Sequence, residues 1–209
     1  YDANAFRLPV GTSTQDRARA QMLALAINTF SQGIAYFHAG TEILRSKSMD
    51  RNSYDSGDWF NRLDWTYQTN YFGTGLPPQT DNGPSWPLMQ PLLANPNLRP
   101  SPADIAFARD TFQDLLAIRA SSTLFRLRTA QDIQTRLTFP NTGPTQNPVV
   151  LVGHLNGRGY PGANFSELLY FINVDKVAQT ITLPDQAGKA YQLHPVQAAA
   201  TGADARVRD

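Results

Sequence analysis

Residues 31–42 of the chain read SQGIAYFHAGTE, and this stretch decides which class of fold the chain can have. The run from Ile34 to Ala39 is nearly continuous in apolar residues and lies between Gly33 and Gly40. Such runs are typical of strands buried on both faces, as in a parallel sheet whose strands are joined by helical crossovers. Because one strand cannot form a sheet, we expect the neighbouring strands to lie upstream of this chain.

An amphipathic helix is predicted immediately before this run. Residues 12–15 (TSTQ) have the form of a capping box. The apolar positions then recur at spacings of four, three and four, at Ala18, Met22, Leu25 and Thr29. This periodicity predicts a helix of about 18 residues that ends near Gly33, because glycine is favoured just after helix C-termini. We expect Arg17, between these positions, to face away from the apolar stripe.

Residues 41–100 show little periodicity. They contain all three tryptophans of the chain, many Asp and Asn residues, and a Pro/Gly-rich stretch from Gly73 to Pro100. A loop of this length inside a domain is usually functional, and its aromatic content argues against simple disorder. We therefore expect a functional loop here.

The last part of the chain changes from helix to strand. Ser101-Pro102 opens a second predicted helix, with proline at its first position. From Leu124 onward, short apolar segments alternate with Gly, Pro and Asn turns, which predicts antiparallel strands. The expected strands are residues 137–139, 149–154, 167–173, 178–183 and 191–194.

Composition excludes several classes of partner. The formal net charge of the 209 residues is +1, and no Lys/Arg cluster is long enough to follow a phosphate backbone. Nucleic acid and anionic membranes are therefore not expected as partners. Cysteine is absent, which removes disulfides and thiol chemistry. No membrane-spanning run or signal peptide is visible, but the chain begins at Tyr1 rather than Met, so its localisation stays unassigned.

Longer motifs resemble one enzyme family. Residues 31–42 resemble the eighth barrel strand of the α-amylase clan of glycoside hydrolases. Residues 43–48 (ILRSKS) and 50–61 (DRNSYDSGDWFN) resemble the pullulanase and limit-dextrinase family in particular. The resemblance continues in the family's order through GLPP at 75–78, WPLM at 86–89, STLFRL at 122–127, FPNTGP at 139–144 and LHPVQ at 193–197.

The resemblance implies an α+β fold in two domains. Residues 1–123 would form the last helix and strand of a (β/α)8 barrel, with a long substrate-side loop. Residues 124–209 would form an antiparallel β-sandwich. Residues 198–209 contain no closing strand, so we expect this second domain to be truncated.

The resemblance also implies a reaction. The family hydrolyses α-1,6-glucosidic bonds in pullulan and branched α-glucans such as limit dextrins, by the retaining route that uses two neighbouring carboxyl groups. Its catalytic carboxylates follow the fourth, fifth and seventh barrel strands, the last in a His-Asp-Asn triplet that is absent from this chain. We therefore expect no catalytic residue here. The isolated chain should be an inactive C-terminal part of a starch-debranching enzyme, whose partner is the missing N-terminal part.

The loop after the predicted strand carries the candidate α-glucan-binding residues. Aromatic surfaces and charged groups with directional hydrogen bonds are the usual means of holding sugars. The candidates are Arg51, which the resemblance places near the glucose units, with Asp50, Asn52, Tyr54, Asp55 and, from the following loop, Asp81.

Simpler interpretations of these residues remain open. Arg51 could pair with a neighbouring Asp and only brace the loop. The Asp residues could hold Ca²⁺, although no EF-hand spacing is present, so a metal is left unassigned and no other cofactor is expected. Trp59 and Trp65 are expected to be packing residues, and His38 a hydrogen-bonded core histidine.

A non-catalytic function is the alternative for the whole chain. The strand-rich part from residue 124 onward could be a carbohydrate-binding or structural module. In either case, the predicted helix and strand at 12–40 would expose apolar faces without their neighbours. We therefore expect the chain alone to be poorly soluble.

Overall fold

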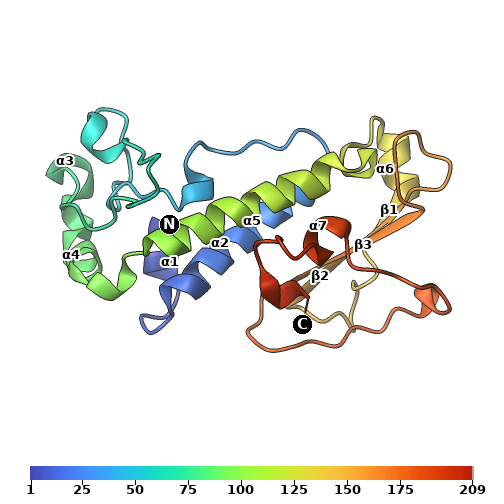
Figure 1. Cartoon of the computed structure of the whole chain (residues 1–209). Helices are drawn as coiled ribbons and strands as arrows, with labels where there is room; N and C mark the ends of the chain where they lie inside the picture. Colours follow the sequence, from blue (N-terminus) through green and yellow to red (C-terminus); the bar gives the residue numbers. More distant parts are fainter. Residues whose placement is uncertain (209) are drawn as a thin grey trace. The chain divides into compact units, whose positions relative to one another are not determined.

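The computed structural model describes residues 1–208 (Figure 1). The chain divides into two compact units. The first contains residues 1–22 and 37–112, and the second contains residues 23–36 and the chain from Gln113 onward. Two long helices, α2 (Thr14–Phe30) and α5 (Pro102–Ala120), each contribute their first part to the first unit and their last part to the second. Within residues 1–208, no helix is both long and apolar enough to cross a membrane.

Helix α2 confirms the helix predicted from periodicity. It follows the short helix α1 (Asp2–Arg7), and Ser13 caps it by accepting a hydrogen bond from the Asp16 backbone N–H at 3.1 Å. The predicted apolar stripe is buried at Ala18, Met22, Leu25 and Thr29.

Arg17 lies off the apolar stripe, as expected, but it does not face solvent. Arg17 is fully buried, and its guanidinium donates to the carbonyl oxygens of Asn4 (2.5 Å), Pro9 (2.6 Å) and Thr12 (3.1 Å). A buried charged group is tolerated when hydrogen bonds replace its lost hydration. These carbonyls belong to α1 (Asn4) and to the stretch that joins α1 to α2 (Pro9 and Thr12), so the periodicity of α2 contains no sign of them.

The strand expected at residues 34–40 does not form. This segment has no strand pairing in the described chain, and Ile34 and Tyr36 are 84% and 82% exposed. A strand requires a neighbour that accepts and donates its backbone hydrogen bonds, and residues 1–208 offer none beside this segment. The segment is instead held by side chains: Arg119 donates to the Gly33 carbonyl at 2.8 Å, and Asn28 to the Tyr36 carbonyl at 2.6 Å. The barrel remnant is therefore not seen as a strand.

Residues 41–100 contain short helices joined by tight turns. The two α-helices are α3 (Gln79–Asn82) and α4 (Trp86–Ala94). The 3-10 turns are η1 (Thr41–Ile43), η2 (Asp58–Phe60), η3 (Gly83–Ser85) and η4 (Pro96–Leu98). One apolar cluster holds these pieces together and consists of Ala5, Phe72, Met89, Leu93 and Leu98. The members of this cluster are spread from Ala5 to Leu98, which explains the weak periodicity.

The core of the second unit is formed where helices meet the sheet. Helix α5 confirms the second predicted helix, and η5 (Thr123–Arg126) and α6 (Ala130–Arg136) follow it. The buried cluster contains Ile118, Leu124, Phe125, Leu127, Leu155 and Ala163. Phe30 of α2 packs against this cluster, with its ring centroid 5.1 Å from that of Phe125.

Three of the five expected strands form one antiparallel sheet. The strands are β1 (Leu137–Thr138), β2 (Val150–Asn156) and β3 (Glu167–Asn173), in the order β1-β2-β3. Gly153 lies opposite Tyr170, whose ring occupies the space that a larger residue would need.

The two remaining expected strands, 178–183 and 191–194, are wrong. Both segments are largely exposed and unpaired, and they lie among η6 (Pro184–Gln186), α7 (Pro195–Ala198) and η7 (Ala205–Val207). The described residues therefore form a single three-stranded layer in an α+β arrangement, without the second sheet that a sandwich needs.

Candidate functional site

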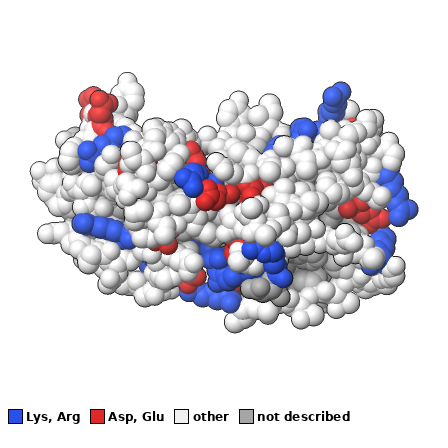
Figure 2. Space-filling model, in the orientation of Figure 1, with Lys and Arg blue, Asp and Glu red and all other residues white. Residues whose placement is uncertain are grey.

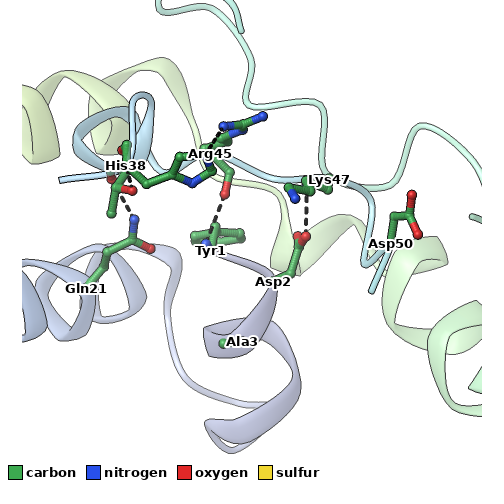
Figure 3. A pocket seen from close by; sticks show the side chains of 9 residues that line it. Tyr1, Asp2, Ala3, Gln21, His38, Arg45, Lys47 and Asp50 are labelled. Atoms are coloured by element: carbon green, nitrogen blue, oxygen red, sulfur yellow. Dashed lines mark hydrogen bonds between the residues drawn. The ribbon is translucent and has the colours of Figure 1, made fainter. Parts of the chain in front are cut away.

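The first unit contains a polar pocket of about 280 Å³ (Figure 3). It lies among α1, α2 and the segment that follows residue 37, and most of its lining residues are polar or charged. They are Tyr1, Asp2, Ala3, Gln21, His38, Thr41, Arg45, Lys47 and Asp50. In Figure 3, Asp50 lies on the opposite side of the pocket from Gln21.

Asp2 organises the turn that forms one wall of the pocket. Its carboxylate accepts hydrogen bonds from the Ser46 hydroxyl (2.5 Å) and from the backbone N–H groups of Lys47 (2.9 Å) and Met49 (3.1 Å). Ser48 and Met49 have left-handed backbone angles, with φ of 50° and 65°, which non-glycine residues adopt only when held there. Asp2 therefore fixes the start of the loop that carries the candidate glucan-binding residues.

Arg45 and His38 form a second polar contact in the pocket wall. Arg45 Nη1 lies 2.8 Å from His38 Nε2, and Arg45 Nη2 donates to the Asn61 carbonyl at 3.2 Å. Because a guanidinium can only donate, His38 Nε2 must accept, and the ring proton must lie on Nδ1. His38 is exposed rather than buried, so the expectation of a core histidine was wrong, although its ring is hydrogen-bonded.

Asp50 and Asn82 join two loops that are far apart in sequence. Asp50 is 7% exposed, and its Oδ1 accepts from Asn82 Nδ2 at 2.9 Å. Asn82 is fully buried, and its Oδ1 accepts from the Arg51 backbone N–H at 3.0 Å. Asp50 Oδ2 is buried without a hydrogen-bond partner among the described residues. Asp81 had drawn attention to the following loop, but its neighbour Asn82 was assigned no structural role from sequence.

The other predicted glucan-binding residues are exposed. Arg51, Asn52 and Asp55 lie on the surface of the loop, and Tyr54 is 95% exposed. Asp81 is exposed on α3, next to the buried Asn82 that contacts the loop. Within residues 1–208, no carboxylate lies in ion-pair range of the Arg51 guanidinium, so the bracing role considered for Arg51 is not observed.

The far end of the loop is closed by Asn61. Its Nδ2 donates to the carbonyl oxygens of Ser53 and Gly57, both at 3.1 Å, and its Oδ1 accepts from the Ser53 hydroxyl at 3.0 Å. Lys47 Nζ donates to the same hydroxyl at 2.7 Å. These bonds make residues 53–61 a closed, internally supported loop.

Two tryptophans on and after this loop are more exposed than expected. Trp59 and Trp65 are 51% and 55% exposed, so their assignment as packing residues was wrong. The Arg62 guanidinium lies 4.1 Å from the ring centroid of Trp59 and 3.8 Å from that of Tyr71. Sequence spacing suggested no such stack, because Tyr71 is brought in by a turn with φ of 61°.

That turn begins at Asp64, whose carboxylate is nearly saturated with hydrogen bonds. It accepts from the Thr66 hydroxyl at 2.5 Å and from the backbone N–H groups of Gln68 (3.0 Å) and Thr69 (2.9 Å). The hydrogen bond from the Thr66 hydroxyl, followed by these N–H groups, lowers the pKa of Asp64. Asp64 therefore supports the backbone that positions Tyr71, and its oxygens are already occupied.

The acidic residues do not form a metal site in the part of the chain that is described. Among residues 1–208, no three His, Asp or Glu side chains gather closely enough to hold an ion. The face shown in Figure 2 has basic and acidic side chains interspersed over a mostly uncharged surface, rather than one continuous basic tract.

Comparison with known proteins gives one consistent family. The family model described as "Alpha-1,6-glucosidases, pullulanase-type, C-terminal" matches residues 67–209. The chain is 42% identical to the chloroplastic pullulanase 1 of Arabidopsis thaliana, over 94% of this chain and 21% of that protein. It is 32% identical to the pullulanase of Klebsiella pneumoniae, over 94% of this chain and 18% of that protein.

Solved structures give the same result. Ligand-free PulA from Klebsiella pneumoniae matches 92% of this chain and 18% of its own, with a TM-score of 0.82 and 32% identity. A Klebsiella pneumoniae pullulanase complexed with maltotriose matches 81% of this chain and 16% of its own, with a TM-score of 0.74 and 32% identity. The chain thus spans about a fifth of the length of the relatives that it matches.

Proposed function

Because this chain belongs to the pullulanase-type C-terminal family of α-1,6-glucosidases, we propose that it works as the C-terminal part of a starch-debranching hydrolase. The substrates would be pullulan and branched α-glucans, cleaved at α-1,6-glucosidic bonds by the retaining route. The observation that carries this proposal is the 42% identity with a pullulanase over 94% of the chain.

The catalytic carboxylates would come from the N-terminal part of the same enzyme. No His-Asp-Asn triplet occurs in these 209 residues. The segment at residues 34–39, which pairs with no strand in the described chain, supports this proposal, because its exposed side chains Ile34 and Tyr36 suit a neighbouring barrel strand. The N-terminal part would therefore be both the structural partner of this segment and the source of the bond-breaking groups.

The loop from Asp50 to Asp55 would help to hold the glucan, with Asp81 beside it. Arg51 supports this best, since its backbone is fixed by Asn82 while its guanidinium has no acidic partner in the described chain. A donor-only group held in this way can bind vicinal sugar hydroxyls. Asn52, Tyr54 and Asp55 are exposed enough to join it. The buried Asp50 would act mainly by positioning the loop.

Activity assays on a chimaera test this function. The 209 residues would replace the corresponding C-terminal region of the Arabidopsis thaliana pullulanase, and pullulan hydrolysis would be measured for the chimaera and for the chain alone. We expect hydrolysis by the chimaera and none by the chain. Arg51→Ala in the chimaera should raise KM more than it lowers kcat, because it removes a binding contact. Robust hydrolysis by the chain alone, or a folded but inactive chimaera, would overturn the assignment.

A further inference from the structure

An exposed aromatic ring lies at the far end of the loop that carries Arg51. Trp59 belongs to the 3-10 turn η2, and its ring packs on the Arg62 guanidinium at 4.1 Å. The other partner of that guanidinium is the Tyr71 ring, at 3.8 Å. Trp59 nevertheless remains 51% exposed. We propose that Trp59 and Arg62 form a binding site for a linear α-glucan, in which one glucose ring stacks on the exposed face of Trp59 and an adjoining glucose unit meets Arg62.

The surface is built to stay in place without a ligand. The backbone N–H groups of Asn61 and Arg62 both donate to the Asp58 carbonyl, at 3.0 and 2.9 Å, which closes the turn beneath Trp59. The Asn61 side chain ties the same turn to Gly57 at 3.1 Å. A side chain that is already ordered loses little conformational entropy on binding. Trp59 is therefore pre-organised as a platform.

Arg62 supplies the polar half of the site. Its Nε is buried without a hydrogen-bond partner, and its terminal amino groups form no hydrogen bond with the described residues. A buried donor without an acceptor is uncommon in native proteins and requires an explanation. The two rings stabilise the charge of Arg62 but accept none of its directional hydrogen bonds. The terminal amino groups are therefore available to ligand hydroxyls.

The chemistry of this pair fits a neutral sugar. A pyranose ring has an apolar C–H face that can lie on the free face of the indole, and the hydroxyl groups of an adjoining glucose unit can accept from the guanidinium at the edge of the ring. This inference rests on the proposed glucan function, because the platform lies on the same loop, and it extends the grip on the glucan beyond Arg51. An inorganic anion could use Arg62 but would gain nothing from the exposed ring of Trp59.

The chain contains its own controls for a direct test. Trp65 is as exposed as Trp59, but no ring or cation stacks on it among the described residues. The Trp86 indole N–H donates to the Pro77 carbonyl at 2.9 Å. Three indole N–H signals therefore report a stacked exposed ring, an unstacked exposed ring and a hydrogen-bonded ring.

The test is a titration of the 209-residue chain, labelled at the tryptophan indoles, with maltotriose, followed by NMR. We expect the Trp59 signal to shift saturably, while the signals of Trp65 and Trp86 stay in place. Arg62→Met should weaken the apparent affinity about tenfold by removing the stacked cation and its donors. A stationary Trp59 signal, equal shifts of Trp59 and Trp65, or displacement of maltotriose by inorganic phosphate would each overturn the inference.

The outcome can be separated from that of the proposed function. Arg51→Ala lowers pullulan hydrolysis in the chimaera if the proposed function holds, and it leaves the Trp59 shift in the chain unchanged. If the chimaera fails while Trp59 responds, the chain binds glucan without serving a debranching enzyme. If the chimaera hydrolyses pullulan while the Trp59 signal does not shift, the proposed function holds and only the binding site at Trp59 is disproved.

Discussion

Residues 150–156 and residues 34–39 are both short apolar runs, but only the first has strands on either side. In β2, Val152 and Leu155 are 1% and 0% exposed, and the strand pairs with β1 and β3. In the other run, Ile34 and Tyr36 are more than four-fifths exposed and no strand lies alongside. The difference shows that an apolar run becomes a strand only when its neighbours are present.

The largest expected difference between the two regions is the cost of removing an apolar side chain. Leu155→Ala should lower the free energy of unfolding of the second unit by about 3 kcal/mol, because it leaves a cavity in a closed core. Ile34→Ala, in the same unit, should change it by less than about 0.5 kcal/mol, since the side chain is already in water. Both changes in unfolding free energy can be measured by urea denaturation, with hydrogen exchange of the β2 amides as the readout.

Similar losses from the two substitutions would contradict the comparison. The chimaera extends the test to the environment of Ile34. If the N-terminal part supplies neighbouring strands, Ile34 becomes buried there, and Ile34→Ala should then cost about as much as Leu155→Ala. An unchanged, small cost in an active chimaera would mean that Ile34 stays exposed in the complete enzyme.

The second expected effect concerns Glu167, which attaches an irregular segment to the sheet without strand pairing. Its carboxylate accepts from Lys189 (2.6 Å), His154 (3.0 Å), Tyr191 (3.0 Å) and Arg158 (3.1 Å). The hydrogen bond from Lys189 is the main cause that lowers the pKa of Glu167 from 4.5 to about 2. Burial, and then the hydrogen bond to Glu167, raise the pKa of Tyr191 to about 12.

These bonds predict a loss of stability in acid. A carboxyl group whose pKa is lowered by folding stabilises the folded state above its unfolded pKa. This contribution is lost as the pH falls from about 5 towards 2. Because Lys189 and Arg158 are 35% and 71% exposed, screening limits the contribution to about 1 kcal/mol. Urea denaturation at pH 7 and at pH 3 measures it.

Glu167→Gln is the matched control for this pH dependence. The amide has nearly the same shape but does not titrate in this range. The variant should therefore be less stable than the parent at pH 7 and nearly equal to it at low pH. An equal dependence on pH in both proteins would show that other carboxyl groups cause the acid loss.

The sequence predicted those elements whose cause is local. Helices α2 and α5 follow from apolar periodicity and from caps at Ser13 and Ser101, all within one helix. Strands β2 and β3 were predicted with bounds close to those observed. The runs at 178–183 and 191–194 look equally strand-like, but apolar pattern alone does not reveal whether a partner strand is present.

The candidate site was only partly predictable, for a related reason. The motif DRNSYDSGDWFN pointed to the loop, yet its start is held by residues outside the motif: Asp2, which bonds to Lys47 and Met49, and Asn82, which bonds to Asp50 across 32 positions of sequence. The stack of Arg62 on Trp59 and Tyr71 likewise depends on a turn at residues 64–69. Contacts made by irregular backbone have no period, so single-sequence reasoning cannot locate them.

The smallest expected effect is at the bond that replaces strand pairing in residues 34–39. Asn28 Nδ2 donates to the Tyr36 carbonyl at 2.6 Å, in an exposed setting where water can replace the donor. Asn28→Ala should therefore lower the free energy of unfolding by only about 0.5 kcal/mol. Backbone amides at 34–36 should exchange rapidly with solvent both before and after the change, whereas those of β2 stay protected.

Thr29→Ala is the control, because it removes a buried hydroxyl one residue away on the same helix. A cost above that of Thr29→Ala would mean that this segment folds cooperatively with the sheet even without a neighbouring strand, and the contrast between the two apolar runs would then disappear.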